Sequence, residues 1–317
     1  MTIGFIGLGE MGRGMAHNLI EKGFDLAVYD VREDAADSLP QHAVVVVERP
    51  ADLLASCSTI LLCLPSSTEV KSVLTDTGGL LTEANDPTAG QPASKSVTLI
   101  DMSTLLRGES VEFARLCEKT GFRYCDCPVS GLPARGRNGT LTLMFGGDRE
   151  TFAAEDKLLS AMSSKLIHCG PVGSGQMMKA VNNVIYNINI AAISEIIPLA
   201  IASGLDTDAV VQTVLSGSSN SFAAGHFLPR VLERQFDGDF AMKSAYKDIQ
   251  NMKALMDEAE ANNSAFSPDS MSTTRGMMAL YDLALDEGYG TSAKSSMFRV
   301  FEKQHGVEVK QKNGGSS

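Results

Sequence analysis

The sequence has no tryptophan, no CxxC pair and no HExxH pattern, and its basic residues do not gather into runs. Lys and Arg number 27 against 38 Asp and Glu, which gives a formal net charge of −11. Proteins that follow nucleic-acid phosphates present basic surfaces, so this charge argues against a nucleic-acid partner. Because the Cys and His spacings of zinc sites are missing, we expect no metal.

Long uninterrupted apolar runs are also missing. The most apolar stretch, residues 183–202, contains Asn, Ser, Glu and Pro, whereas a membrane-spanning helix needs about 20 mainly apolar residues. The opening MTIGFIGLGEMG has no basic segment and is interrupted by glycine, unlike a secretory signal. The six cysteines show no paired spacing, which favours reduced and mostly buried thiols. We therefore expect a cytoplasmic protein that does not enter a membrane.

What the chain does have is an alternation of short apolar segments and helical patterns in its first half. Strands are predicted at 2–6, 25–30, 44–47, 59–65, 97–102, 122–130, 140–147 and 165–170, with helices at 13–22, 68–74 and 108–120. Such alternation predicts a parallel sheet with crossover helices, in the α/β class. At 317 residues the chain is long enough for about two domains.

After Gly175 the pattern changes to helices alone. They are predicted at 176–203, 207–216, 228–236, 242–263, 268–287 and 291–304. Pro198 lies inside the first of them, where it removes a hydrogen bond and should kink or end the helix. We place the boundary in 170-GPVGSG-175, which gives a dinucleotide-binding domain of residues 1–172 and an all-helical domain of residues 173–317. The long helix joins them.

A glycine-rich turn follows the first predicted strand. Gly7 permits a tight turn, Gly9 lets the backbone approach a pyrophosphate, and Gly12 lets the helix pack on the strand. The phosphates would meet backbone N–H groups and the positive end of the helix. The sequence therefore predicts a Rossmann-type cofactor site formed by Gly7, Leu8, Gly9, Glu10, Met11 and Gly12.

An acidic residue should follow such a turn at the tip of the second strand, where it holds the ribose hydroxyls. Asp30 stands there. A carboxylate at this place repels a 2′-phosphate, which favours NAD, while Arg32, two residues on, keeps NADP open.

The first turns of the long helix carry a cation and two amides in an otherwise apolar segment. Lys179 and Asn183 are four residues apart and share one helix face, and Asn182 lies about 60° to the other side of Lys179. A lysine partly removed from water comes nearer to useful proton exchange. We expect this face to hold a small oxygen-bearing substrate beside a nicotinamide. The alternative is a surface lysine with two ordinary amides.

Four segments in this order resemble the β-hydroxyacid dehydrogenase family. They are the N-terminal GFIGLGEMG, 126-DCPVSG-131, 173-GSGQMMKAVNN-183 and 247-KD-248. The resemblance implies a dinucleotide-binding domain joined to an all-helical domain by a long helix. It also implies an NAD(P)-dependent enzyme that interconverts a small 3-hydroxy acid and its semialdehyde.

The resemblance implies residue roles as well. Lys179 would be the catalytic lysine and Asn183 its partner in holding the reacting oxygen, with Asn182 beside them. Ser130 and Gly131 would bind the substrate carboxylate. Leu64 and Pro65 would contact the stretch of the cofactor between adenosine and nicotinamide, and Thr104 the nicotinamide ribose. Lys247 would lie on the cofactor or substrate side of the cleft.

Two departures from the family pattern concern the substrate. Leu132 stands where members commonly have a second glycine, and it would lie beside the carboxylate site. Arg135 and Arg137, on the loop that follows, could pair with a second anionic group of the substrate or be solvated.

Other functions can be weighed against this one. The related 6-phosphogluconate dehydrogenases have a larger helical domain and a histidine before the asparagine, and imine reductases replace the lysine. A catalytically inactive interaction scaffold of the same fold is the alternative from another class. The apolar surface of helix 176–203 also predicts a homodimer or homotetramer.

Overall fold

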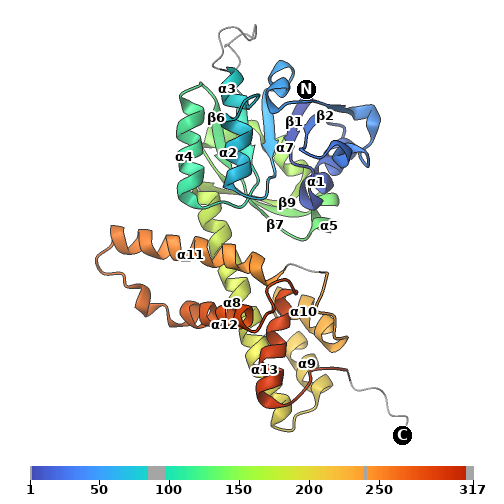
Figure 1. Ribbon diagram of the computed structural model, residues 1–317, viewed down its shortest axis with the longest axis vertical. Helices are drawn as coiled ribbons and strands as arrows, with labels where there is room; N and C mark the ends of the chain where they lie inside the picture. Colours follow the sequence, from blue (N-terminus) through green and yellow to red (C-terminus); the bar gives the residue numbers. More distant parts are fainter. Residues whose placement is uncertain (1, 85–96, 239–240, 312–317) are drawn as a thin grey trace. The chain divides into compact units, whose positions relative to one another are not determined.

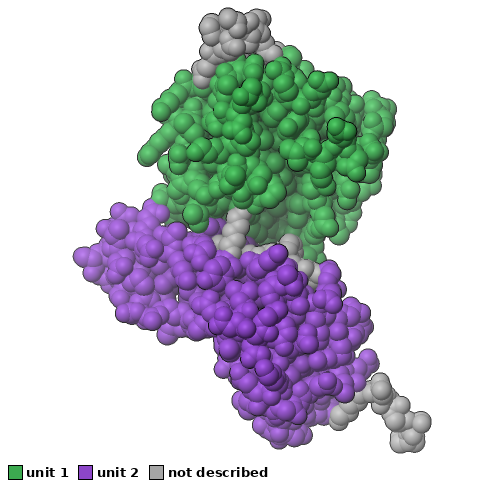
Figure 2. Space-filling model, viewed as in Figure 1, with its two compact units in different colours: residues 1–179 green, residues 180–317 purple. Residues whose placement is uncertain are grey.

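The computed structural model describes residues 2–84, 97–238 and 241–311, except for the side chains of Ser244 and Lys247. The chain divides into two compact units, residues 1–179 and 180–317 (Figure 2). The first unit contains a sheet and the second is helical. The longest helix, α8 (Ser174–Ala202), begins in the first unit and continues into the second.

Nine strands form the sheet of the first unit (Figure 1). They are β1 (Thr2–Ile6), β2 (Asp25–Tyr29), β3 (Val44–Val46), β4 (Thr59–Leu62), β5 (Thr98–Asp101), β6 (Arg123–Asp126), β7 (Val129–Ser130), β8 (Leu141–Gly146) and β9 (Ser163–Gly170). Their order is β3-β2-β1-β4-β5-β6-β8-β7, with β9 beside β8, and the first six are parallel. This is the order of the doubly wound dinucleotide-binding fold, which reverses direction between β1 and β4. The predicted fold class is confirmed.

Helices cover both faces of this sheet. They are α1 (Glu10–Glu21), α2 (Ser67–Thr75), α3 (Leu80–Ala84), α4 (Arg107–Glu118), α5 (Pro133–Arg137), α6 (Arg149–Ala154) and α7 (Asp156–Ala161), with short 3-10 turns η1 (Glu33–Ala36), η2 (Gln41–Ala43) and η3 (Pro50–Ala55). Neighbouring strand residues point to opposite faces. Phe5 therefore packs in the core beneath α1 and α7, whereas Ile6 packs in the core beneath α2, α3 and α4.

Some expectations for this unit are wrong. The sheet is not wholly parallel, because β8 runs antiparallel to β6 and β7. The strand predicted at 122–130 divides into β6 and β7 around Pro128, whose nitrogen has no hydrogen to donate. The segment predicted as a loop after Leu132 is the short helix α5, which begins at Pro133. Helices α3, α6 and α7 were not predicted because five or six residues are too few to show a helical period.

The second unit is helical, as predicted. Besides α8 it contains α9 (Thr207–Ser216), α10 (Phe222–Leu232), α11 (Met242–Asn262), α12 (Ser272–Asp286) and α13 (Met297–His305), with 3-10 turns η4 (Pro268–Ser270) and η5 (Lys294–Ser296). One apolar cluster joins α8, α11, α12 and α13, and a second joins α8, α9, α10 and α13. Among the described residues of this unit, the one strand-like pairing is a single bridge between Ala241 and Ala293.

Helix ends in this unit differ from the predictions where proline is involved. The helix predicted at 228–236 is α10, which begins six residues earlier because Ser221 caps it by accepting from the nitrogen of Ala224. Pro229 lies inside that helix. The helix predicted at 268–287 divides into η4 and α12. Pro198 does not end α8, which continues to Ala202.

Helix α8 is long and apolar enough, by length and composition alone, to cross a membrane. Core helices of globular proteins have the same properties, and α8 contributes Val184, Ala191 and Ile197 to the clusters of the second unit. Other apolar side chains of the helix are exposed, among them Ile185 and Ile196.

Candidate functional site

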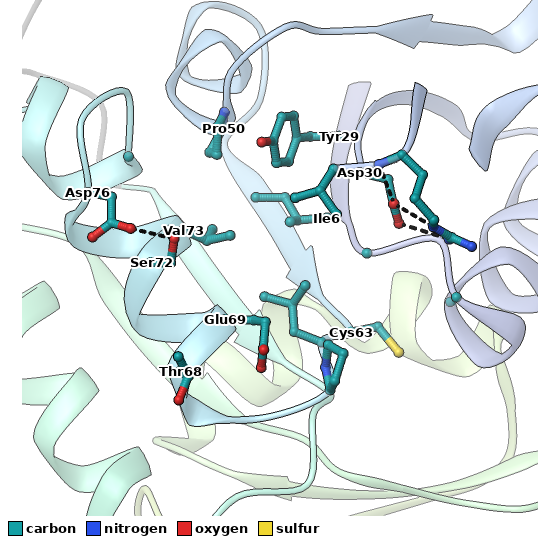
Figure 3. Close-up of a pocket in the computed structure, with 18 of the residues that line it drawn as sticks. Ile6, Tyr29, Asp30, Pro50, Cys63, Thr68, Glu69, Ser72, Val73 and Asp76 are labelled. Carbon is teal, nitrogen blue, oxygen red and sulfur yellow. Dashed lines mark hydrogen bonds and ion pairs between the residues drawn. The ribbon is translucent and has the colours of Figure 1, made fainter. Parts of the chain in front are cut away.

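A cavity of about 660 Å³ opens at the carboxyl ends of β1, β2 and β4 (Figure 3). Ligands of open α/β sheets bind at this edge, where the strand order reverses. The cavity is lined by nine of the predicted cofactor residues, Gly7, Gly9, Glu10, Met11, Gly12, Asp30, Arg32, Leu64 and Pro65. Thr104 does not line it, and the side chain of Lys247 lies outside the described residues.

The three glycines of the turn have different spatial constraints. Gly7 has a φ of +95°, and a Cβ added to it would lie 2.3 Å from the carbonyl oxygen of Cys63. A Cβ on Gly12 would lie 2.0 Å from the carbonyl oxygen of Gly7, so both residues must be glycine for the chain to pack. A Cβ on Gly9 would meet no protein atom within 4 Å. The open side of Gly9 therefore leaves space for a ligand rather than for the protein.

The amino end of α1 faces the same space. Gly9 caps the helix without a side chain, and the first N–H groups of a helix have no partner within it. These groups and the helix dipole favour a negatively charged ligand. The turn and the helix end together fit the pyrophosphate of a dinucleotide.

The side chain of Asp30 closes one side of the turn. Its Oδ2 accepts from the backbone nitrogen of Leu8 at 2.7 Å, and its Oδ1 accepts from Nε of Arg32 at 3.0 Å. The Arg32 guanidinium also donates to the carbonyl oxygen of Leu8 at 3.0 Å. Burial acts to raise the pKa of Asp30, but the hydrogen bonds from Arg32 and Leu8 outweigh it and lower the pKa below 3.8. The carboxylate is therefore ionised at neutral pH.

The opposite wall was not predicted from the sequence, apart from Leu64 and Pro65. It consists of α2, which presents Glu69, Ser72 and Val73, and of Pro50 at the start of η3. Figure 3 shows these side chains across the cavity from Asp30, with Tyr29 beside Pro50. Most of the α2 side chains that line the cavity are polar, and the sequence offers no motif that marks this helix surface as a ligand wall.

Gln176, in the first turn of α8, holds the loop that follows β5 at the same edge of the sheet. Its Oε1 accepts from the backbone nitrogen of Leu105 at 3.0 Å, and its Nε2 donates to the carbonyl oxygen of Ser103 at 2.9 Å. The hydroxyl of Ser103 in turn accepts from the nitrogen of Leu64 at 2.9 Å. The loops after β4 and β5 are thus held to the start of the helix that carries Lys179.

Asp126, the last residue of β6, holds the start of α8 from the other side. It is fully buried, and its two oxygens accept from the backbone nitrogens of Gly173 at 2.6 Å and Gln176 at 2.8 Å. Burial raises the pKa of Asp126 to about 6, although these two hydrogen bonds lower it. A Cβ on Gly146 would lie 2.3 Å from one carboxylate oxygen, so glycine leaves the space that Asp126 occupies.

Ser130, Gly131 and Leu132, the predicted carboxylate site, connect β7 to α5. Ser130 pairs with Thr142 of β8, and Gly131 has a φ of +146°. The guanidinium of Arg135 donates to the carbonyl oxygen of Thr140. Arg137 forms an ion pair with Glu21 of α1 at 3.5 Å. Both arginines thus have a partner within the first unit.

The predicted polar face of α8 is present on a continuous helix. Lys179 is half-buried and is the last residue of the first unit. One turn later the half-buried Asn183 donates through Nδ2 to Oδ1 of Asp248 at 2.7 Å. Its Oδ1 accepts from Nδ2 of Asn182, which is exposed, at 3.0 Å. Asp248 was not predicted, although it is the second residue of the KD pair.

Comparison with known proteins gives the same organisation. Residues 2–170 match the NAD binding domain of 6-phosphogluconate dehydrogenase, and residues 173–301 match the NAD-binding domain of NADP-dependent 3-hydroxyisobutyrate dehydrogenase. The mitochondrial 3-hydroxyisobutyrate dehydrogenase of Rattus norvegicus is 31% identical over 316 residues, which cover 95% of this chain and 87% of the relative. The enzyme of Homo sapiens is 30% identical over 309 residues, with the same coverage.

A solved structure agrees with these relatives. The 3-hydroxyisobutyrate dehydrogenase of Mycobacterium tuberculosis, solved with L-serine, superposes with a TM-score of 0.77 at 27% identity. The alignment covers 94% of this chain and 98% of that one. The similarity to these enzymes therefore extends over both halves of the chain. The chain belongs to the β-hydroxyacid dehydrogenase family and is an NAD(P)-dependent hydroxyacid dehydrogenase.

Proposed function

We propose that the enzyme interconverts a small 3-hydroxy acid, similar to 3-hydroxyisobutyrate, and its semialdehyde, with Lys179 as the general acid and base. The observation that carries the proposal is the pair of Lys179 and Asn183, one turn apart on α8. Asp126 and Gln176 anchor the turn of α8 that precedes Lys179. The names of two similar relatives, both 3-hydroxyisobutyrate dehydrogenases, support the substrate class.

The proton chemistry follows from the lysine. In the oxidation, the neutral amine of Lys179 accepts the proton of the substrate hydroxyl; in the reduction, its ammonium donates a proton to the developing alkoxide. Asn183 donates a hydrogen bond to the same oxygen, which stabilises charge where it develops. The bound nicotinamide supplies the hydride acceptor or donor. The protein positions the substrate and polarises its reacting group.

We assign the substrate carboxylate to Ser130 and Gly131. A hydroxyl and a backbone N–H at the end of a strand are suitable donors for a carboxylate. Leu132 then limits the space beside this group. Asn182 and Lys247 complete the proposed substrate and cofactor contacts, and Thr104 is assigned to the nicotinamide ribose.

We propose NAD as the preferred cofactor. The ionised Asp30 accepts hydrogen bonds readily, as ribose hydroxyls require, and it repels a 2′-phosphate. Arg32 is paired with Asp30 and with the carbonyl oxygen of Leu8, so a phosphate could gain this arginine only by displacing those contacts.

We further propose a cytoplasmic homodimer or homotetramer that associates through α8. The exposed apolar residues of this helix include Val181, Ile185, Ile196 and Leu199. Consecutive members of this set lie four, eleven and three residues apart, spacings that keep them near one helix face, and such a stripe suits packing against a second helix. A monomer mass in light scattering at micromolar concentration would contradict this proposal.

The test of the activity is a panel of 3-hydroxy acids and semialdehydes, assayed with both cofactors at the absorbance of reduced nicotinamide. We expect turnover of at least one 3-hydroxy acid, and a loss of at least ~10²-fold in kcat for Lys179→Ala with cofactor affinity nearly unchanged. Comparable turnover in that variant would remove Lys179 from the mechanism. A panel without turnover, together with intact cofactor binding, would favour the interaction scaffold.

A further inference from the structure

The side-chain amide of Asn183 donates to the carboxylate of a buried ion pair, Asp248 and Lys294. Asp248 of α11 accepts from its Nδ2 through one carboxylate oxygen, Oδ1, at 2.7 Å. The other oxygen, Oδ2, lies 3.6 Å from Nζ of Lys294, at the start of η5. All three residues belong to the second unit. One carboxylate therefore links the proposed catalytic amide to a lysine that no motif in the sequence marks.

Lys294 is 4% exposed, and lysine is almost never buried to this degree unless its charge is paired. Its Nζ also donates to Oδ1 of Asn187 at 3.1 Å and lies 5.2 Å from the ring centroid of Tyr186. The hydroxyl of Tyr281 donates to the same oxygen of Asn187 at 3.0 Å. Two further side chains, Asn187 and Tyr186, thus contact the cation, and Tyr281 holds Asn187 in place.

This arrangement decides which way the amide of Asn183 points. An ionised carboxylate accepts hydrogen bonds and does not donate them, so the amide nitrogen must face Asp248. The amide oxygen then faces Asn182, from which it accepts at 3.0 Å. The second hydrogen of Nδ2 becomes the donor that a substrate oxygen can meet.

We propose that Lys294 is a positioning residue: its buried charge compensates Asp248, which fixes the amide of Asn183 toward the reacting oxygen. The inference rests on the proposed role of Asn183 in catalysis. Without the lysine, an uncompensated carboxylate would stand next to the place where the substrate oxygen gains negative charge. Removing one partner of a buried pair leaves such a charge unbalanced, whereas removing both leaves none.

The experiment compares the wild type with Asn183→Ala, Lys294→Met and the double variant Lys294→Met with Asp248→Asn. For Lys294→Met we expect kcat to fall roughly tenfold to hundredfold, because the amide is misplaced. KM and the Kd of the reduced cofactor should change by less than about threefold, a split that points to orientation rather than binding. The double variant should recover most of kcat, because an amide at position 248 can still accept from Asn183.

The matched control is Lys303→Met. Lys303 also pairs with a carboxylate of the second unit, that of Glu287 at 2.6 Å, but its side chain is largely exposed. The same chemical change there should leave kcat as in the wild type. A readout that needs no substrate is the NMR signal of the Asn183 side-chain amide, assigned by its absence in Asn183→Ala. We expect this signal to shift in Lys294→Met and not in Lys303→Met.

Several outcomes would overturn the inference. It fails if Lys294→Met keeps kcat within about twofold of the wild type, or if the double variant is as impaired as the single one. If Lys294→Met does not fold, the double variant provides the test. The positioning role is wrong if the double variant loses as much kcat as Asn183→Ala does. If Asn183→Ala itself turns over normally, the proposed function is wrong at that residue. If Asn183→Ala is impaired and Lys294→Met is not, the positioning role alone is wrong.

Discussion

Asp126 and Gln176 join the end of β6 to the first turn of α8, because the carboxylate accepts from the backbone nitrogen of Gln176 at 2.8 Å. The side chain of the same glutamine holds the loop after β5. Lys179 follows three residues later on a continuous helix. Its backbone therefore has a fixed position relative to the strand ends of the first unit, which is where the cofactor cavity lies.

Gln176→Leu should show how much this junction contributes. The change leaves the nitrogen of Leu105 and the carbonyl oxygen of Ser103 buried without the side chain that pairs them. We expect the free energy of unfolding of the first unit, measured with urea, to fall by roughly 2–4 kcal/mol. The control Gln250→Leu changes an exposed glutamine of α11. Equal stability of the two variants would mean that the junction contributes nothing.

The buried carboxylate of Asp126 predicts a pH dependence. Its pKa is raised from 3.8 to about 6 in the folded protein, mainly by burial, so the folded state binds a proton more readily than the unfolded state. The stability that this group contributes is then fully present below about pH 4 and is lost as the pH rises through about 6.

The measurement is the difference in free energy of unfolding between the wild type and Asp126→Asn, by urea denaturation from pH 4.5 to 7. We expect the free energy of unfolding of the wild type to fall relative to that of Asp126→Asn as the pH rises, by roughly 2 kcal/mol between pH 4.5 and 7. A constant difference, or one of the opposite sign, would contradict the raised pKa.

Much of the fold could be predicted because it depends on regular patterns. The apolar segments at 2–6, 25–30, 59–65 and 97–102 are separated by turn residues, and β1, β2, β4 and β5 lie within them. The strand β8 was also predicted, but its antiparallel direction could not be predicted from such a pattern. A strand's direction depends on the path of its connection, and its residue pattern is equal in both directions. The start of α10 was missed because Pro229 reads as a helix start and lies inside the helix.

In the candidate site, too, residues that belong to a local motif could be predicted, whereas residues with partners distant in sequence could not. The glycine turn and Asp30 could be predicted because their spacing follows from the geometry of one strand, one turn and one helix. Gln176 and Asp126 were missed because their partners are backbone groups of segments distant in sequence. Lys294 was missed for the same reason. A lysine between small residues gives no sign of burial, and the acceptors come from α8 and α11.

Gly9→Ala and Gly12→Ala should show whether the glycine turn binds the cofactor or has only a structural role. A Cβ on Gly12 would lie 2.0 Å from the carbonyl oxygen of Gly7, so this variant should lose about 1–3 kcal/mol of stability as well as cofactor binding. A Cβ on Gly9 meets no protein atom within 4 Å. Gly9→Ala should therefore keep its melting temperature and lose at least about tenfold in NAD affinity, which is ~1.4 kcal/mol. Unchanged affinity in a stable Gly9→Ala protein would place the pyrophosphate elsewhere.

Asp30 and Arg32 give the sharpest test of cofactor choice. The carboxylate of Asp30 should repel the 2′-phosphate of NADP, whereas the guanidinium of Arg32 can bind it. Asp30→Ser removes the repulsion of a 2′-phosphate and releases the Arg32 guanidinium, whose Nε now donates to Asp30 at 3.0 Å. NAD should bind more weakly and NADP more tightly, so that the ratio of the two Kd values shifts by at least about 10²-fold, or ~2.7 kcal/mol. Adding Arg32→Ala should abolish the gain for NADP and leave the loss for NAD. Fluorescence titration with both reduced cofactors measures the two Kd values of each variant, and a ratio that does not change would exclude Asp30 from cofactor discrimination.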